Sequence, residues 1–393
     1  MAWENFKVEE QRLQLVEAYI EGETSMTDLC LKYGISRKTA YKWYYRFLEE
    51  GKAGLKDLST APHNPNYLYP EELIQKAIDY KFKHRNWGPK KILVNLKKLY
   101  PDDDWPCPTR LYEIFKEYNL VTKRRLRSRV PATSPLGGLI DCNDTWAVDF
   151  KGWFKTGDGH KCEPLTITDS VSRYLIRCTH LNPHTIDYVW PVFDEAFREY
   201  GLPNRMRSDN GPPFGSVGVG RLTRLSVKLI KAGVTPEWIR PGHPEENGRH
   251  ERFHLTLKQE VASPPKETLA LQLQAMQTFH DEYNFVRPHE ALDMKTPGSC
   301  YYHSPRVWNG VFKSPEYDTR EMQVRKVQAC GGITIKGKDQ FIGEALIGEY
   351  IGLKPTHKDE LEIYYGHVYL GKLTKKGVEK PKIESSIKRR KMN

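Results

Sequence analysis

The sequence predicts a multi-domain α/β protein in which helical domains precede an α/β core and a small β-barrel follows it. Three patterns support this prediction. Apolar residues recur at helical spacing through about the first 120 residues, strand-like runs alternate with helical ones in the middle of the chain, and short alternating runs follow from about residue 316. A length of 393 residues with 38% hydrophobic residues provides for several cores of ordinary size.

The first helical domain is expected at residues 1–55. Apolar residues predict helices at 8–20 and 26–33, Gly34 breaks the second helix, and Ser36 can cap a third. A short break between two helices is typical of a helix-turn-helix motif.

The third helix of this domain has two faces. Ala40, Trp43 and Phe47 recur at helical spacing and predict the buried face. Basic residues on the other face favour DNA binding over the alternative, a purely structural bundle. The candidate DNA contacts are Arg37, Lys38, Tyr41 and Lys42.

A second helical domain is expected at residues 67–122. Its predicted helices lie at 71–83, at 89–99 and from Thr109 onward, with Pro89 in a first helical turn. A basic run follows, which is either a phosphate-contacting segment or a solvated linker, and its charge favours contact. The candidate DNA contacts in it are Lys123, Arg124, Arg125 and Arg127.

An α/β domain is expected at residues 136–305. Its predicted strands lie at 147–155, 165–168, 174–178, 204–208 and 237–239, and its predicted helices at 186–200, 222–232 and 268–285. A small β-barrel is expected at 316–375 and a basic disordered tail at 376–393.

Three acids in the α/β domain stand in informative places. Asp149 interrupts an apolar strand, where an unpartnered charge costs several kcal/mol. Asp209 follows a strand at an Asn-Gly turn, at the edge of the sheet, and Glu251 opens a helical pattern. Singly, Asp209 is more often a turn former and Glu251 a solvated helix residue.

Together, the three acids predict a metal site. Divalent ions such as Mg²⁺ select carboxylate oxygens, and two ions roughly 3.5–4 Å apart serve phosphoryl transfer. We therefore expect Mg²⁺, with Mn²⁺ as a possible substitute. No cysteine or histidine pair has the spacing typical of zinc.

Around these acids the chain resembles the DDE transposase and integrase group, which comprises retroviral integrases and insertion-sequence transposases. The resemblance is carried by residues 146–152, 169–173, 207–214, 243–257 and 283–292. It implies a ribonuclease-H-like integrase catalytic core at 136–305 and a second helix-turn-helix at 67–122. It also implies that Asp149, Asp209 and Glu251 are the catalytic metal ligands.

The third acid has alternatives. Glu245 leaves 35 residues after Asp209 (positions 210–244), the spacing associated with retroviral members, whereas Glu251 leaves 41 (positions 210–250). Glu245 follows Pro244 in a turn, but Glu251 begins an apolar helix. Context therefore favours Glu251 over Glu245 or Glu246.

Net charge and targeting signals indicate which classes of partner to expect and where the protein is located. The chain has 61 Lys+Arg against 50 Asp+Glu, a net charge of +11, which attracts a phosphate backbone in a salt-dependent way. Beside the third acid, Arg252 and Lys258 are candidate DNA contacts, or else solvated helix charges. Scattered cysteines and the lack of an apolar leader or membrane span predict a cytoplasmic protein with no membrane partner. The resemblance to insertion-sequence transposases implies that it is prokaryotic and nucleoid-associated.

The resemblance implies a DNA transposase or integrase that binds terminal inverted repeats, exposes 3′-hydroxyl ends and transfers them into target DNA. Its partners would be double-stranded DNA and further copies of itself, assembled on that DNA. Two alternatives remain: a nuclease of the same fold that only hydrolyses, and a non-catalytic DNA-binding regulator.

Overall fold

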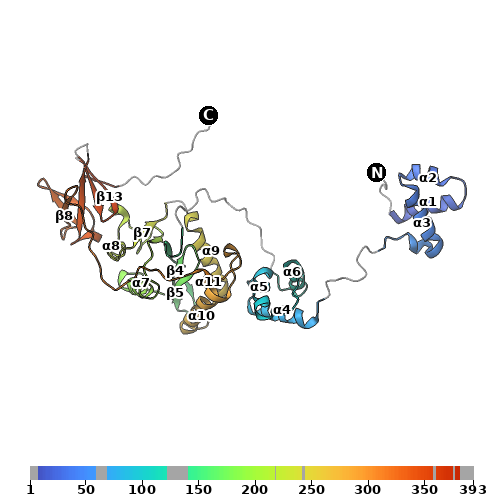
Figure 1. The fold of residues 1–393 in the computed structure, drawn as a ribbon, viewed down its shortest axis with the longest axis horizontal. Coiled ribbons are helices and arrows are strands. Elements are labelled where there is room, and N and C mark those ends of the chain that lie inside the picture. The colour runs from blue at the N-terminus through green and yellow to red at the C-terminus, as the bar shows by residue number, and fades with distance from the viewer. Residues whose placement is uncertain are drawn as a thin grey trace, which may run out of the picture. The chain divides into compact units, whose positions relative to one another are not determined.

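The computed structural model describes residues 8–58, 69–121, 140–216, 218–240, 244–356, 360–374 and 377–380. The chain divides into two compact units, residues 1–69 and residues 70–393, and each is described by itself. Figure 1 colours the elements in chain order.

The first unit is a three-helix domain. Its elements are α1 (Val8–Ile20), α2 (Met26–Tyr33), α3 (Arg37–Glu50) and a 3₁₀ turn (Gly51–Leu55). Gly34 ends α2 in the left-handed region at φ 63°, which glycine adopts without steric cost, and the Ser36 hydroxyl accepts a hydrogen bond from the Thr39 N–H at the start of α3. The predicted helix-turn-helix is confirmed.

A buried cation holds this domain together. Leu15, Val16 and Ala40 are fully buried, and Trp43 packs beside them. The Arg12 guanidinium lies 3.7 Å from the Trp43 ring centroid and donates to the Leu55 carbonyl at 2.7 Å. These contacts close the 3₁₀ turn over the helices.

The predicted DNA face of α3 is largely exposed. Arg37, Lys38 and Lys42 are exposed, as expected. Tyr41 is half-buried instead, because its ring packs edge-to-face on Tyr19. Phe47, predicted as core, is also only partly buried.

A second group of helices opens the larger unit. It contains α4 (Glu71–Lys83), α5 (Pro89–Leu99) and α6 (Pro108–Glu117). Trp87, Ile92, Leu111 and Phe115 are buried among them.

These helices dock on the α/β core through side-chain hydrogen bonds. His84 Nδ1 lies 2.7 Å from Glu282 Oε1, the Asn86 amide donates to the Gln259 carbonyl at 3.1 Å, and the Asn95 amide donates to the Val286 carbonyl at 3.2 Å. The three acceptors belong to two π-helical turns, Lys258–Ala262 and Glu282–Val286. Such turns are often found at functional sites.

The core is a mixed five-stranded sheet of order β5-β4-β1-β6-β7 (Figure 1). The strands are β1 (Thr145–Phe150), β4 (Pro164–Asp169), β5 (Leu175–His180), β6 (Arg205–Ser208) and β7 (Thr235–Trp238). β1 runs antiparallel to β4 and parallel to β6. This order and these directions are those of the expected ribonuclease-H-like fold.

Helices cover both faces of this sheet. They are α7 (Ile186–Tyr200), α8 (Arg224–Lys231), α9 (Gly248–Leu257) and α10 (Leu269–Asp281), with the short α11 (Pro297–Cys300) following. Trp146 and Val148 of β1 pack with side chains of α7 and α8. Side chains alternate along a strand, so Ala147 and Asp149 face the other side, where α9 and α10 pack.

Two predicted elements differ from those observed. The strand expected at 147–155 stops at Phe150, because Gly152 turns the chain at φ 80°, and the chain resumes as the hairpin β2 (Phe154–Lys155) and β3 (Lys161–Cys162). The helix expected at 268–285 ends at Asp281 and continues as a π-helical turn. The fully buried Asn284 holds that turn, accepting from the Leu175 N–H at 2.8 Å and donating to the Leu175 carbonyl at 2.9 Å.

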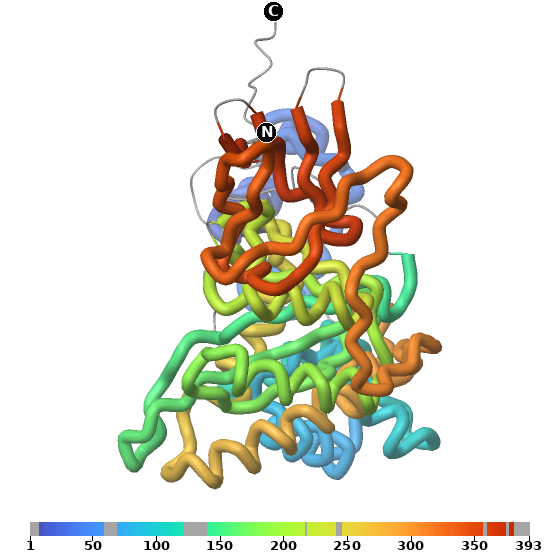
Figure 2. Tube along the Cα trace, turned by 90° about the vertical axis from the view of Figure 1, so that its left-hand side faces the viewer, coloured from blue at the N-terminus to red at the C-terminus, as the bar shows by residue number. Residues whose placement is uncertain are grey.

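The C-terminal domain is an open sheet of order β14-β13-β12-β11-β8 with a separate β9–β10 hairpin. The strands are β8 (Gln323–Lys326), β9 (Gly332–Ile335), β10 (Lys338–Phe341), β11 (Tyr350–Pro355), β12 (Leu361–Tyr365), β13 (Val368–Thr374) and β14 (Gly377–Glu379). Val227 and Ile230 of α8 join its core, and Figure 2 shows these strands (red) lying against the yellow-green helices.

The expected barrel is not closed among the described strands, since β8 and β14 stay at opposite edges. Residue alternation reports which face a side chain takes and not whether first and last strands meet. β14 also lies within the expected tail, and its Val378 pairs with Leu373 of β13. Residues 381–393 lie outside the described residues. In the part of the chain that is described, no helix has the length and apolar character needed to cross a bilayer.

Candidate active site

Asp149 lies near the end of β1 on the face covered by α9. Its side chain is 24% exposed, and its carbonyl accepts a hydrogen bond from the Thr166 hydroxyl at 3.0 Å. Thr166 is its register partner on β4. The paired antiparallel strands therefore fix the backbone from which this carboxylate projects.

Asp209 follows β6 directly. β6 runs parallel to β1 with Arg207 opposite Ala147, so Asp209 and Asp149 lie at the same end of neighbouring strands. The Gly211 N–H donates to Asp209 Oδ1 at 3.2 Å, which forms a turn that holds the carboxylate at the sheet edge. The position predicted for Asp209 is the one observed.

The third acid lies on a helix, as predicted. Glu251 is exposed in the first turn of α9. Glu246, one of its alternatives, forms an ion pair with Arg240 and accepts from the Arg240 backbone N–H at 2.8 Å. Glu245 lies in a 3₁₀ turn, Pro244–Asn247, and its side chain lies outside the described atoms.

The three carboxylates interact electrostatically. Burial, followed by the negative charges of Asp209 and Glu251, raises the pKa of Asp149 from 3.8 to about 7. An acid shifted this far by burial and like charges is typical of a functional site. The arrangement concentrates negative charge that a cation would offset.

Cations border the same carboxylates. Burial lowers the pKa of Lys151, with the charge of Lys258 lowering it further and that of Asp149 raising it, so Lys151 lies near both the acid and Lys258. Lys258 is exposed, as is Arg252 beside Glu251. The sequence pattern does not single out Lys151, which directly follows the last residue of β1.

Two histidines of α9 face the sheet. His250 is 1% exposed, and burial lowers its pKa well below the ordinary range. Burial, with Lys151 contributing, lowers the pKa of His254 to about 3. Both imidazole Nε2 atoms lie 2.8 Å from the Thr166 hydroxyl, and His254 Nδ1 lies 3.9 Å from Asp149 Oδ2. Their four-residue spacing on a helix is a signal for this pairing, but it does not reveal Thr166.

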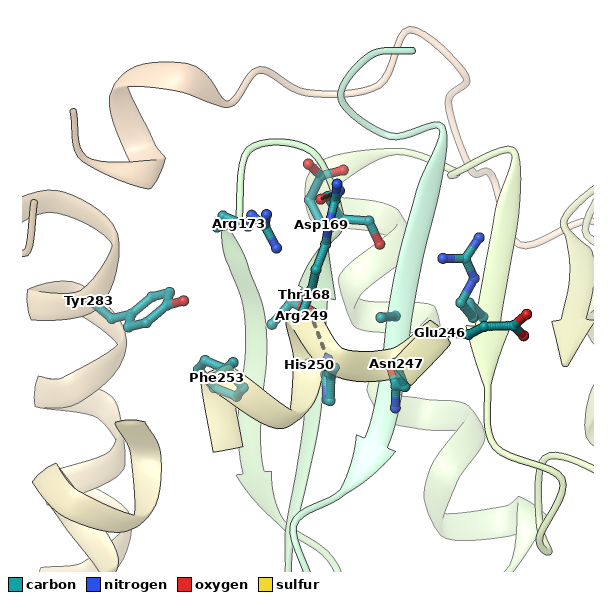
Figure 3. A pocket seen from close by; sticks show the side chains of 12 residues that line it. Thr168, Asp169, Arg173, Glu246, Asn247, Arg249, His250, Phe253 and Tyr283 are labelled. Atoms are coloured by element: carbon teal, nitrogen blue, oxygen red, sulfur yellow. Dashed lines mark hydrogen bonds between the residues drawn. The ribbon is translucent and has the colours of Figure 1, made fainter. Parts of the chain in front are cut away.

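A small cavity lies at the start of α9. Figure 3 shows side chains that line it, among them Arg173, Arg249 and Asp169, and the hydrogen bond between His250 and Thr168. Its volume is about 20 Å³, enough for a water molecule but far below that of a substrate pocket. Asp169 is a turn acid, because it accepts from the N–H groups of Val171 and Ser172.

A larger cleft of about 830 Å³ lies between α4–α6 and α9. Its lining includes five cationic side chains, those of Lys81, Arg85, Lys91, Arg252 and Arg287. Burial, followed by the charge of Arg287, lowers the pKa of Lys91 to about 8. The predicted DNA contacts Lys123, Arg124, Arg125 and Arg127 lie outside the described residues.

Comparison with protein families agrees with this architecture. An integrase core domain family matches residues 142–244, and a second family described as integrase core domain matches residues 232–297. A helix-turn-helix domain family matches residues 11–63. The family described as the C-terminal domain of IS481 family transposases matches residues 322–377.

Relatives come from mobile elements. The chain is 23% identical over 250 residues to an uncharacterized 39.2 kDa protein of insertion element IS476 from Xanthomonas euvesicatoria, spanning 62% of this chain and 69% of that protein. It is 27% identical over 232 residues to an uncharacterized 31.7 kDa protein of insertion element IS407 from Burkholderia multivorans, spanning 58% and 79%. The catalytic core of HTLV-2 integrase, solved with magnesium, is 17% identical and covers 42% of this chain and 99% of that one, with a TM-score of 0.33 that is too low to argue from.

The sheet order and the matched domains define an enzyme with an integrase catalytic core and a helix-turn-helix DNA-binding domain. More narrowly, its middle domain is matched by integrase core families, its C-terminal domain by that of IS481 family transposases, and its relatives are proteins of insertion elements. The class inferred from the three acids is confirmed, and an integrase core of this kind uses divalent metal.

Proposed function

We propose that this transposase binds terminal inverted repeats, exposes 3′-hydroxyl ends and transfers them into target DNA. The observation that carries the proposal is the convergence of Asp149, Asp209 and Glu251 from two parallel strands and a helix. The electrostatic effect of the latter two on Asp149 supports their nearness. Glu246 is a poorer candidate, because its carboxylate is already paired with Arg240.

The residues present fit a divalent ion. Asp149, Asp209 and Glu251 offer the hard oxygen ligands that Mg²⁺ prefers, and Mn²⁺ is expected to substitute. When bound, a pair of such ions would activate the attacking oxygen and stabilise the leaving one. The strands and the helix hold the carboxylates close together in the DNA-free protein, so the repulsion between their charges is present before DNA binds.

Cationic residues would position the DNA. Lys151, whose charge acts on Asp149, and Lys258, whose charge acts on Lys151, would contact a phosphate beside the acids, and Arg252 lines the neighbouring cleft. On the separate N-terminal domain the proposed contacts are Arg37, Lys38, Tyr41 and Lys42. The residues proposed for the segment between α6 and β1 are Lys123, Arg124, Arg125 and Arg127. We expect two DNA ends to be brought together by a homo-oligomer.

The test is 3′-end processing and strand transfer with oligonucleotides from the DNA that flanks the gene, in Mg²⁺ and in Mn²⁺. Wild type is compared with Asp209→Asn, Glu251→Gln and, as matched controls, Glu245→Gln and Glu246→Gln. Joined products should be lost in the first two variants and retained in the controls. Loss of joined products in Glu245→Gln with their retention in Glu251→Gln would identify Glu245, in the turn before α9, as the third acid.

Two other outcomes would replace the proposal. Nicking without joining by the wild type would indicate a nuclease of the same fold. Salt-dependent binding of the ends without nicking or joining in either metal would indicate a DNA-binding regulator.

A further inference from the structure

The hydrogen bonds around Thr166 involve both histidines of α9. His250 and His254 are one turn apart, with ring centroids 4.6 Å from each other. The fully buried Thr166 hydroxyl lies 2.8 Å from Nε2 of each ring and 3.0 Å from the Asp149 carbonyl. A single hydroxyl therefore joins both rings to the strand that carries Asp149.

Counting protons fixes the ring tautomers. A threonine hydroxyl has one proton to donate and two lone pairs that accept. The Asp149 carbonyl can only accept, so the Thr166 proton goes to it. Both lone pairs then accept, and Nε2 of His250 and of His254 must each carry a proton.

The remaining ring nitrogens are in different positions. His250 Nδ1 lies 2.9 Å from the Thr168 hydroxyl, which can donate to it, so both nitrogens of that ring are satisfied (Figure 3). His254 Nδ1 faces Asp149 Oδ2 at 3.9 Å, beyond hydrogen-bond reach. Among the described residues this is the only polar contact recorded for that nitrogen.

Two electron-pair donors thus face each other across a gap. Metal bonds from an imidazole nitrogen or a carboxylate oxygen measure about 2.1 Å each, so one ion can span up to about 4.2 Å between its two ligands. One carboxylate oxygen of Asp149 and one ring nitrogen of each of His250 and His254 lie within 4.8 Å of one another. Ligating histidines usually have their other ring N–H held by a hydrogen bond, which Thr166 provides here.

We propose that His254 Nδ1 is a ligand of the divalent ion held by Asp149, with Thr166 and His250 as positioning residues. The inference rests on the metal-dependent function proposed above and adds a nitrogen to its carboxylate ligands. Imidazole nitrogen is a better ligand for a transition ion such as Mn²⁺ than for Mg²⁺. The His254 ligand should therefore raise the affinity for Mn²⁺ relative to that for Mg²⁺.

The test uses the full-length protein with Mn²⁺ and pulsed electron paramagnetic resonance, which detects nitrogen bound to manganese. Wild type should show a ¹⁴N coupling that becomes a ¹⁵N coupling when histidine alone is ¹⁵N-labelled. His254→Gln should bind Mn²⁺ without this coupling. His160→Gln, which changes an exposed histidine on the β2–β3 hairpin, should keep it.

The outcomes separate the two proposals. Mn²⁺ bound by wild type without any histidine coupling, or a coupling that survives in His254→Gln, would overturn the role of His254 and leave the carboxylate site standing. Failure of wild type to bind Mn²⁺ would overturn the metal-dependent function and this inference with it. The labelled wild type needs no substitution, so a poorly folded variant does not affect the result.

Thr166 provides a second readout. Thr166→Val removes the hydroxyl that orients the ring and should lower Mn²⁺ affinity roughly 10- to 100-fold, as loss of such outer contacts does. Thr166→Ser keeps the hydroxyl and should restore affinity. Equal affinities in the two variants would contradict a positioning role.

Discussion

Replacing Asp149 by asparagine should stabilise the metal-free protein, and do so increasingly as pH rises. Burial, with the charges of Asp209 and Glu251, raises the pKa of Asp149 from 3.8 to about 7. Each pKa unit corresponds to about 1.4 kcal/mol, so keeping this carboxylate charged in the folded state costs about 4 kcal/mol. Asparagine fills the same space without the charge.

The pH window follows from the sign of the shift. Between pH 4 and pH 7 the unfolded chain loses the Asp149 proton while the folded protein keeps it, so the stability of wild type falls as pH rises. The advantage of Asp149→Asn should therefore be near zero at pH 4, grow up to pH 7 and level off above it. For a core of this size, about 4 kcal/mol corresponds to a Tm difference on the order of 10 °C.

The assay is thermal unfolding of wild type and variant in EDTA at several pH values. Subtracting the two curves removes the contribution of titrating groups that do not interact with Asp149. Adding Mg²⁺ at 100 times its Kd should then stabilise wild type alone by about 2.7 kcal/mol. A Tm difference that is the same at pH 5 and pH 8 in EDTA would refute the reasoning.

Three other substitutions test separate parts of the structure. Asn284→Ala leaves the N–H and carbonyl of Leu175 without partners. In urea titrations the free energy of unfolding should therefore fall by roughly 2–4 kcal/mol, and a loss below roughly 0.5 kcal/mol would contradict a stabilising role for these two hydrogen bonds. Arg12→Met keeps the apolar stem but loses the buried hydrogen bonds, and should cost roughly 1–3 kcal/mol of N-terminal domain stability, seen as faster proteolysis of that domain. Removing three exposed cations of α3 together should reduce the salt dependence of DNA binding by a slope of about 3, and an unchanged slope would argue against this face. These cations are Arg37, Lys38 and Lys42.

Features set by local sequence could be predicted. Gly34 and Ser36 mark the helix-turn-helix because a left-handed turn and a hydroxyl cap depend only on neighbouring residues. The edge position of Asp209 followed from a strand meeting a turn, and Glu251 was placed on a helix by the apolar residues after it. The same local logic failed at Gly152, whose positive φ ends β1 early.

Features set by distant contacts could not be predicted. Asn284 bonds to Leu175 across 109 positions, and no local pattern shows that a π-helical turn will form there. Thr166 contacts His250 across 84 positions, so the shared hydroxyl emerges only once α9 packs on β4. Barrel closure failed as a prediction for the same reason, because it depends on whether the two end strands meet.

The docking of α4–α6 on the π-helical turns has a thermodynamic consequence. Asn86 bonds to the turn that continues α9, the helix that carries Glu251 and His254. Any ligand that shifts α4–α6 against this turn also perturbs the acid and the imidazole. If DNA on these helices changes the affinity for metal by some factor, linkage requires that metal change the affinity for DNA by the same factor. Binding of a DNA end and binding of the metal needed to cut it would then be coupled parts of one equilibrium.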